Sequence, residues 1–395
     1  MLFSTQNTRN DCGEQIHLQM VGVCLENVVG SGMGPKLRYT EVDNLKKVKL
    51  PHAEVSAALE SLMKIPGVEE AFIWNTCNRF EVYFFHTSNR RELEARIEET
   101  FFAPICEERS KLNYLSDTDV VHHLVRTAVG FNSGLPGERD VAQQLHSAVR
   151  LASMAGASGP LTEALSDSVF EMAREIREET VWKRFSPSYC GAALEEALRD
   201  TCMGRLQSGR VAVVGSSNTS RGSAEILRRR FGISEENVTV YHRCHHKDGQ
   251  MKSMRRACRG SSRVRVRDYD SDTVHQAIAK SRLVIIGIDR SQPVISGERL
   301  ARHLKGDEQV TVIDFNTFGS CEGLEGLPGV RLVDAAMIED KVRDYANRLV
   351  HNPEFLNALE VLEPMVRERV RGLRVVFEDQ VEGKVSVESY ALGVA

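Results

Sequence analysis

The sequence contains no run of about 18 apolar residues, which is the length that a membrane-spanning helix needs, so no such helix is predicted. Its first residues are polar and mixed, without the basic stretch and apolar core of a secretory signal peptide. The 9 cysteines show no paired spacing, and an odd count of this kind is typical of a reducing compartment. We therefore expect a protein of the cytoplasm or of an organelle matrix.

The sequence also lacks an excess of one sign of charge, since the net charge is only −4. This excludes a bias of the whole chain toward nucleic acid. Locally, the segment 252–267 contains basic residues and no acidic one. Such a segment is either a solvated surface or a patch that binds phosphate or RNA. His242, Cys244, His245 and His246 are too crowded to converge on one ion, so no metal site is predicted.

What the sequence does have is ordinary globular composition, with 42% apolar and 27% charged residues over a length of 395. That length predicts two or three domains with a large core. The first part mixes strands and helices: residues 16–21 alternate as in a strand, 53–64 show helical periodicity, and 28–49 are typical of a loop.

A helical stretch follows. Ser116 and Asp119 form a capping-box pattern ahead of a helix that we expect to end at Gly130. His122 and His123 fall outside the two edges of its apolar stripe, where either a cleft or a solvated surface is possible. Helical periodicity then runs from 138 to 179, with a break at 155–160.

From residue 210 the pattern changes to short apolar runs that alternate with helices. The runs are 211–214, 238–241, 282–288 and 310–315, and a helix is expected over 219–231. This alternation predicts an open, doubly wound parallel sheet. The chain is helical again beyond residue 333.

Thr76-Cys77-Asn78-Arg79 interrupts two apolar runs and is followed by Glu81. A cation close to a thiol stabilises thiolate, which is the reactive form of cysteine. A cysteine next to two apolar runs is also often a small core residue. From the residues alone, Cys77 is either an activated nucleophile or part of the core.

The turn after the strand 211–214 stands where a dinucleotide's pyrophosphate would meet the start of a helix. Its sequence, 215–220, keeps the first glycine of G-x-G-x-x-G but not the others. Arg243, at the end of the next strand, suits the 2′-phosphate of NADP, although a surface arginine is an equal alternative. The residues of this predicted cofactor site are Gly215, Ser216, Ser217, Asn218, Thr219, Ser220 and Arg243.

Two blocks together resemble the glutamyl-tRNA reductase family. Residues 75–83, Asn-Thr-Cys-Asn-Arg-Phe-Glu-Val-Tyr, are similar to its S-T-C-N-R-x-E-x-Y signature, with asparagine in place of the serine. The second block is similar to its H-L-F-R, G-L-D-S and G-E run and consists of 123–126, 130–133 and 137–138, with Gln144 on the family's glutamine.

The resemblance implies that Cys77 attacks the ester of glutamyl-tRNA to form a thioester, which NADPH reduces to glutamate 1-semialdehyde. It implies that His123 assists proton transfer and that Arg79 pairs with the substrate carboxylate. The implied substrate-binding residues are Thr76, Arg79, Ser133, Glu138 and Gln144. A homodimer and an aminomutase that accepts the aldehyde are further implied partners.

The chain departs from the family's G-A-G loop at residues 215–217, and it lacks the Pro-Arg pair after Asp314. Two alternatives therefore stay open: transfer of the Cys77 acyl group without reduction, and a non-catalytic homologue that binds tRNA or a partner. The resemblance predicts an α+β catalytic domain, a Rossmann-like NADPH domain and a C-terminal helical domain on a long connecting helix. The predicted bounds are 14–160 for the catalytic domain, 161–186 for the helical connector, 187–335 for the NADPH domain and 336–395 for a shortened helical domain that would form the dimer.

Overall fold

The computed structural model describes residues 16–24, 42–76, 78–87, 89–105, 112–184, 187–198, 203–215, 217–242, 265–268, 271–288, 292–305, 309–316, 318–349 and 351–372. The contacts divide the chain into two units. The first unit joins the residues up to Pro187 to those from Ala346 on, and the second unit spans Ser188–Tyr345. The predicted domain bounds stay a prediction.

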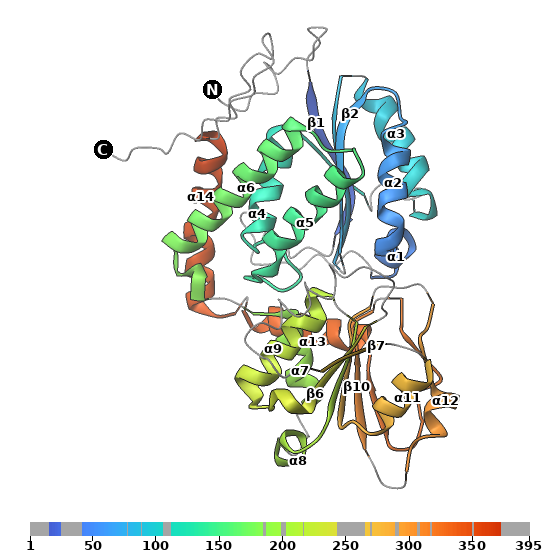
Figure 1. The fold of residues 1–395 in the computed structure, drawn as a ribbon. Coiled ribbons are helices and arrows are strands. Elements are labelled where there is room, and N and C mark those ends of the chain that lie inside the picture. Colours follow the sequence, from blue (N-terminus) through green and yellow to red (C-terminus); the bar gives the residue numbers. More distant parts are fainter. Residues whose placement is uncertain are drawn as a thin grey trace. The chain divides into compact units, whose positions relative to one another are not determined.

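The first unit is built on a 4-stranded antiparallel sheet in the order β2-β3-β1-β4. All residues of β3 are buried, because β1 and β2 flank it and helices cover the sheet on both sides (Figure 1). The strands are β1 (His17–Cys24), β2 (Val68–Asn75), β3 (Arg79–His86) and β4 (Asn113–Ser116).

The helices of the first unit include the two that the break at 155–160 predicted, α5 (Asp140–Met154) and α6 (Pro160–Glu179). Pro160 begins α6, where its missing N–H costs no helical hydrogen bond. The others are α1 (Val42–Val48), α2 (Val55–Leu62), α3 (Arg90–Phe101), α4 (Thr118–Ala128) and α14 (Pro353–Gly372), with 3-10 turns at His52–Glu54 (η2) and Val181–Arg184 (η4).

Two local predictions in this unit are wrong. Ser116 does not cap α4, because it ends β4, and the chain turns at Asp117 with a φ of 51°. The carboxylate of Asp117 instead accepts a hydrogen bond of 3.1 Å from the Leu18 amide of β1. The segment 28–49 is not all loop, because it contains α1 at its end.

Helix α14 packs against α4 and α6 within the first unit (Figure 1). The Trp182 and Phe355 rings lie 5.3 Å apart, Arg369 pairs with Glu175 at 3.0 Å, and Glu363 pairs with Arg126. In this structure residues 353–372 therefore complete the unit that contains the candidate catalytic residues. The dimerisation role of this region stays a prediction.

The second unit is a 6-stranded parallel sheet in the order β12-β10-β8-β5-β6-β7. The first strand in sequence, β5, lies in the middle, and the strand order reverses between β5 and β8, as in a doubly wound sheet. This confirms the predicted Rossmann-like fold. The strands are β5 (Val211–Val214), β6 (Val238–His242), β7 (Arg265–Asp268), β8 (Leu283–Ile286), β10 (Val310–Asp314) and β12 (Val330–Val333).

Strands β5 and β8 are buried throughout, which explains why they read as continuous apolar runs. A small 2-stranded sheet pairs β9 (Ile295–Ser296) with β11 (Cys321–Glu322). The helices are α7 (Tyr189–Leu198), α8 (Met203–Gln207), α9 (Asn218–Phe231), α11 (Ser271–Ala279) and α12 (Gly297–Ala301), with the turn Glu235–Asn237 (η5), and α13 (Ala335–Leu349) runs across the boundary with the first unit.

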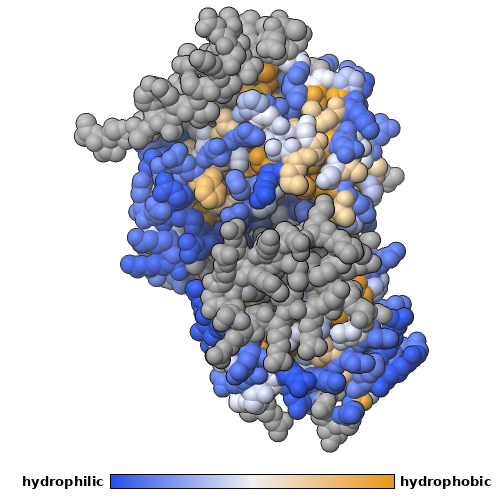
Figure 2. Space-filling model, viewed as in Figure 1, coloured by the Kyte–Doolittle hydropathy of each residue, from blue (hydrophilic) through white to orange (hydrophobic). Residues whose placement is uncertain are grey.

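Among the described helices, none has the length and apolarity that a membrane crossing requires. On the coloured part of the face shown in Figure 2, apolar side chains are interspersed with polar ones. The exposed large apolar side chains in the described part are Met154, Phe170, Val181, Met337 and Val361.

Candidate active site

A buried charge network lies on one face of β3. Residues two apart on a strand point to the same side, and Arg79, Glu81 and Tyr83 follow this period. Arg79 lies 3.4 Å from both carboxylate oxygens of Glu81, and the Tyr83 hydroxyl donates to Glu81 at 2.7 Å. His123 from α4 lies 3.0 Å from Glu81 through Nε2. The structure thus brings together two predicted site residues, Arg79 and His123, through a carboxylate between them.

Glu81 is ionised in this network. Burial raises the pKa of its carboxyl, but the charge of Arg79, the interaction with His123 and the hydrogen bond from Tyr83 outweigh burial and lower the pKa to about 2. Gly22 of β1 stands opposite Glu81, and a Cβ there would lie 2.8 Å from the Glu81 Cα atom. A glycine is therefore needed at this sheet position to make room for the network.

The loop between α4 and α5 supplies the second part of the site. The Asn132 carbonyl accepts a hydrogen bond of 3.0 Å from Arg79, whose guanidinium also lies 4.6 Å from the centre of the Trp74 ring. Ser133 donates to Glu138 at 3.0 Å. Ser133 and Glu138 are both buried. Together with Arg79 on β3, three of the predicted substrate-binding residues therefore lie on this strand and this loop.

Two side chains from the region after the loop hold its ends. Arg177 on α6 donates to the carbonyls of Val129 at 2.6 Å and Gly137 at 3.1 Å. The Trp182 indole donates to the same Val129 carbonyl at 2.8 Å. Because buried carbonyls need donors, these contacts fix the backbone from which Ser133 and Glu138 project.

Glu138 differs from Glu81 in its surroundings. Burial, followed by the nearby charge of Asp140, raises the pKa of its carboxyl to about 7, although the Ser133 hydroxyl and Arg79 favour the ionised form. Near neutral pH the Glu138 carboxyl is therefore partly protonated, whereas the Glu81 carboxyl is ionised.

The raised pKa of Glu138 predicts a pH-dependent gain in stability for Glu138→Gln. The folded state holds the Glu138 proton more tightly than the unfolded chain, so ionisation lowers stability as pH rises from about 4.5 to about 7. Relative to wild type, E138Q should gain up to about 3 kcal/mol in unfolding free energy between pH 5 and pH 8. Urea unfolding followed by tryptophan fluorescence measures this, because both tryptophans, Trp74 and Trp182, lie in the first unit. Exposed Glu60→Gln on α2 is the control, and a difference between E138Q and wild type that does not vary with pH would contradict the prediction.

The other predicted residues of the first unit are less connected. Thr76 lies in the turn between β2 and β3, where its hydroxyl accepts from the Asn78 amide at 3.2 Å. Gln144 is half-buried on α5. Cys77 lies outside the described residues, so its role stays a prediction.

In the second unit, the turn after β5 keeps one of the expected glycines, in a backbone conformation that other residues rarely adopt. Gly215 has a φ of 106°, and a Cβ there would collide with the Gly287 carbonyl after β8. Ser217 caps α9 by accepting the Ser220 amide at 3.1 Å, and the Ser220 hydroxyl donates to the Gly287 carbonyl at 3.3 Å. A Cβ at Gly287 would collide with the Ser220 side chain. In the usual G-x-G-x-x-G turn a glycine on the helix lets helix and strand pack closely; here α9 carries Ser220 instead, and Gly287 after β8 provides the space.

The remaining predicted cofactor residues are only partly described. Asn218 begins α9, and the Thr219 carbonyl accepts a hydrogen bond from the Cys190 thiol at 3.5 Å. Ser216, Arg243 and the basic positions 252–264 lie outside the described residues, as do Cys244, His245 and His246. Among the residues that are described, no group of three or more potential metal ligands is found.

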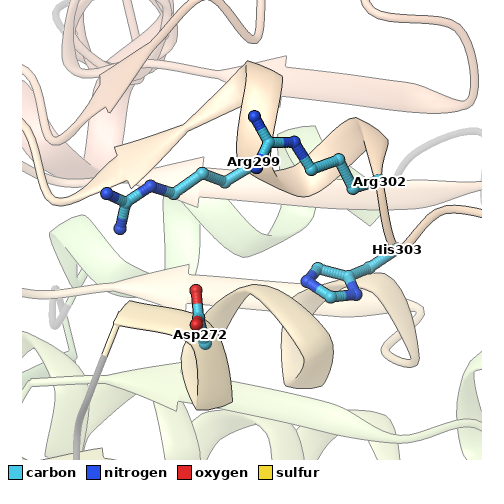
Figure 3. A pocket seen from close by; sticks show the side chains of 4 residues that line it. All are labelled: Asp272, Arg299, Arg302 and His303. Atoms are coloured by element: carbon cyan, nitrogen blue, oxygen red, sulfur yellow. The ribbon is translucent and has the colours of Figure 1, made fainter.

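A polar pocket on the second unit lies between α11 and α12 (Figure 3). Asp272, Arg299, Arg302 and His303 line it, and Arg302 also pairs with Glu298. None of the predicted site residues lines this pocket. The charges of its two arginines are offset by the carboxylates of Asp272 and Glu298.

Sequence reasoning missed the residues that connect the site. Asn132, Arg177 and Trp182 act through backbone and amide contacts that depend on the loop conformation, and no local pattern signals them. Glu81 and Tyr83 were signalled by their period-two spacing from Arg79 along an apolar run.

Fold and site together define a class: an α+β domain with a buried Arg-Glu-His network, joined to a doubly wound domain of the dinucleotide-binding type. Residues 33–180 match the family model of the Glutamyl-tRNAGlu reductase N-terminal domain. This part of the chain therefore resembles the N-terminal domain of glutamyl-tRNA reductases.

Named relatives are similar over a longer part of the chain. The glutamyl-tRNA reductase of Synechococcus sp. (strain JA-3-3Ab) is 28% identical over 308 residues, which cover 76% of this chain and 68% of the relative. That of Thermosynechococcus vestitus (strain NIES-2133 / IAM M-273 / BP-1) is 26% identical, over 72% of this chain and 65% of its own length. The matches thus span about two thirds of these relatives. Among solved structures, glutamyl-tRNA reductase from Methanopyrus kandleri aligns with 89% of this chain and 78% of its own, at 21% identity and a TM-score of 0.41.

Proposed function

We propose that this chain reduces the glutamyl group of glutamyl-tRNA to glutamate 1-semialdehyde, with NADPH as reductant and Cys77 as nucleophile. The observation that carries the proposal is the buried Arg79, which follows Cys77 by two residues and is held by Glu81 and Asn132. A fixed cation next to a cysteine in sequence favours the thiolate form. The similarity to glutamyl-tRNA reductases suggests the substrate and the reaction.

In the first step the Cys77 thiolate attacks the ester carbonyl carbon of the aminoacyl group. A carbon–sulfur bond forms, the ester carbon–oxygen bond breaks, and the ribose oxygen of the tRNA leaves with the proton that the thiol gave up, which His123 would deliver. NADPH supplies the hydride that the second step requires. Once the thioester carbon has received that hydride, the carbon–sulfur bond would break, which would release the aldehyde and restore the Cys77 thiolate.

The buried loop and β3 supply the polar groups for the glutamyl moiety. Arg79 would bind the side-chain carboxylate, with Thr76, Ser133 and Gln144 as hydrogen-bond partners. Glu138 would bind the α-ammonium group of the substrate. The pKa of its carboxyl is raised to about 7. A cation bound next to it would lower that pKa, so that the carboxyl would lose its proton. His123 would take up or deliver the proton of the thiol.

The second unit has features that fit a dinucleotide. The tight turn at Gly215, the start of α9 and the point of strand reversal between β5 and β8 coincide, which is where pyrophosphate binds in doubly wound sheets. Ser217 and Ser220 occupy the positions of the second and third glycines of G-x-G-x-x-G, and their hydroxyls lie 3.3 Å apart. Ser217, Thr219 and Ser220 would bind the phosphates, and Arg243 would select NADPH through its 2′-phosphate.

The partners follow from the reaction. Glutamyl-tRNA is the substrate, and a reactive aldehyde product suits direct transfer to an aminomutase. A homodimer and a location in the cytoplasm or an organelle matrix belong to the same proposal.

The test combines NADPH oxidation with mass spectrometry of the Cys77 peptide. With glutamyl-tRNA and NADPH, the wild-type protein should oxidise NADPH and form the aldehyde; without NADPH, it should carry a glutamyl adduct on Cys77. Cys77→Ser should lose both signals, because an alcohol is a far weaker nucleophile than a thiolate. Cys12→Ser is the matched control and should keep both.

Two outcomes would contradict reduction. An adduct on Cys77 with untouched NADPH would indicate acyl transfer without reduction. No adduct and no oxidation, with tRNA binding unchanged in Cys77→Ser, would indicate a binding protein.

A further inference from the structure

Asn132 contacts three charged or titratable side chains of the buried network. It is only 6% exposed and lies in the loop after α4. Its side-chain oxygen accepts from Arg126 Nε at 3.1 Å, its carbonyl accepts from Arg79, and its amide nitrogen lies 3.5 Å from His123 Nδ1. Asn132 therefore stands between the candidate catalytic histidine and two arginines.

The arginine contact fixes which way the amide points. A guanidinium carries only donors, so the Asn132 atom that faces Arg126 is the oxygen. Arg126 is itself held in place by Glu363 of α14, and its guanidinium lies 4.0 Å from the centre of the Phe131 ring. The amide nitrogen of Asn132 must then face His123.

The amide in turn fixes the hydrogen on the histidine. An amide NH2 group only donates, so His123 Nδ1 must accept, and the ring hydrogen must lie on Nε2. The Nε2 hydrogen then points at Glu81 Oε1, 3.0 Å away, where an ionised carboxylate accepts it. Both contacts are satisfied by one tautomer of the neutral ring.

We propose that Asn132 is a positioning residue that holds His123 as the neutral tautomer with its hydrogen on Nε2. Protonation of Nδ1 would place an N–H group against the amide N–H of Asn132. Asn132 therefore opposes imidazolium formation, which Glu81 favours, and the balance sets the pH at which His123 gains a proton. The resemblance places Asn132 at the aspartate of the G-L-D-S stretch, and a carboxylate there would accept from a protonated Nδ1 instead.

The other charges that face this histidine have defined positions. Arg79 lies beyond Glu81 on β3, and His122 and Arg126 lie on α4 with it. Burial, followed by Arg126 and Arg367, lowers the pKa of His122 to about 4, so this neighbour stays neutral above that pH. Glu363 of α14 pairs with Arg126 and also lies 3.4 Å from His122.

The test is nitrogen NMR of the full chain labelled with ¹⁵N in the histidine rings, with His123 assigned by comparison with His123→Gln. The wild-type protein at pH 7 should show a protonated Nε2 and an unprotonated Nδ1. In Asn132→Asp the midpoint of His123 protonation should rise by about one pH unit or more. Asn352→Asp, which makes the same change at the start of α14, should leave His123 unchanged.

A wild-type spectrum with the hydrogen on Nδ1, or with both nitrogens protonated at pH 7, would overturn the proposal even if Asn132→Asp failed to fold. An unchanged midpoint in a folded Asn132→Asp protein would also overturn it. The spectra need no tRNA or NADPH, so this result is separate from the success or failure of the proposed reaction.

Discussion

Glu81→Gln is expected to lower the free energy of unfolding of the first unit by about 3–5 kcal/mol at pH 7. The substitution keeps the shape of the side chain but removes the negative charge that faces Arg79 and His123. Arg79 is 1% exposed, so its charge would stay buried without compensation. Urea unfolding followed by the fluorescence of Trp74 and Trp182 measures the loss.

The pH dependence separates the charge from a packing effect. Because the pKa of Glu81 is lowered to about 2, its contribution is complete above pH 4.5 and is lost as the pH falls toward 2. The difference between wild type and E81Q should therefore shrink in acid. Glu92→Gln is the control: this exposed residue pairs with Arg96 on α3, and its loss should change stability by less than about 0.5 kcal/mol. A loss below about 1 kcal/mol in E81Q would show that the network is not a buried ion pair in solution.

Gly130→Ala is expected to destabilise the first unit by about 4 kcal/mol and to reduce turnover at least tenfold. Gly130 has a φ of 88°, and a Cβ there would lie 2.6 Å from the Glu138 carbonyl oxygen. The Gly130 carbonyl also accepts from the Gly137 amide at 2.8 Å, so the two ends of the loop meet at this point. The added methyl group must push them apart and displace Ser133 and Glu138.

Gly156→Ala is a matched control for this prediction. Gly156 has a φ of 70°, but a Cβ there would have no atom within 4 Å. It should cost only the conformational strain, about 1–2 kcal/mol, and leave turnover unchanged. Equal effects of the two substitutions on unfolding and on turnover would mean that the contact between Gly130 and Glu138 is unimportant.

Much of the fold follows from local pattern. The buried strands β5 and β8 are continuous apolar runs, and the break between α5 and α6 is marked by Gly156, Gly159 and Pro160. The Ser116 capping box failed because Asp117 is held by a strand remote in sequence, and such a contact leaves no local signal. Tertiary structure there overrides the capping preference.

The site was predictable where its residues are adjacent in sequence. Arg79, Glu81 and Tyr83 share one strand face, so their meeting follows from the strand period. The amide of Asn132 and the donors Arg177 and Trp182 depend on how the loop closes, and the sequence reveals that closure only through its glycines. The shift of the close-approach glycine to Gly287 is similar: it needs β8 to lie beside β5, which is a property of the sheet order.

The donors at the Val129 carbonyl have a consequence for the order of synthesis. The chain leaves the ribosome from its amino end, so the loop emerges before Arg177 and Trp182, and Trp182 emerges long before Phe355 packs against it. The whole second unit is translated between these events. The helix α14, which packs in the first unit, is therefore translated only after the second unit. Until α14 has been made, Arg126, which donates to Asn132 in the site, lacks the Glu363 partner that it has in the finished fold.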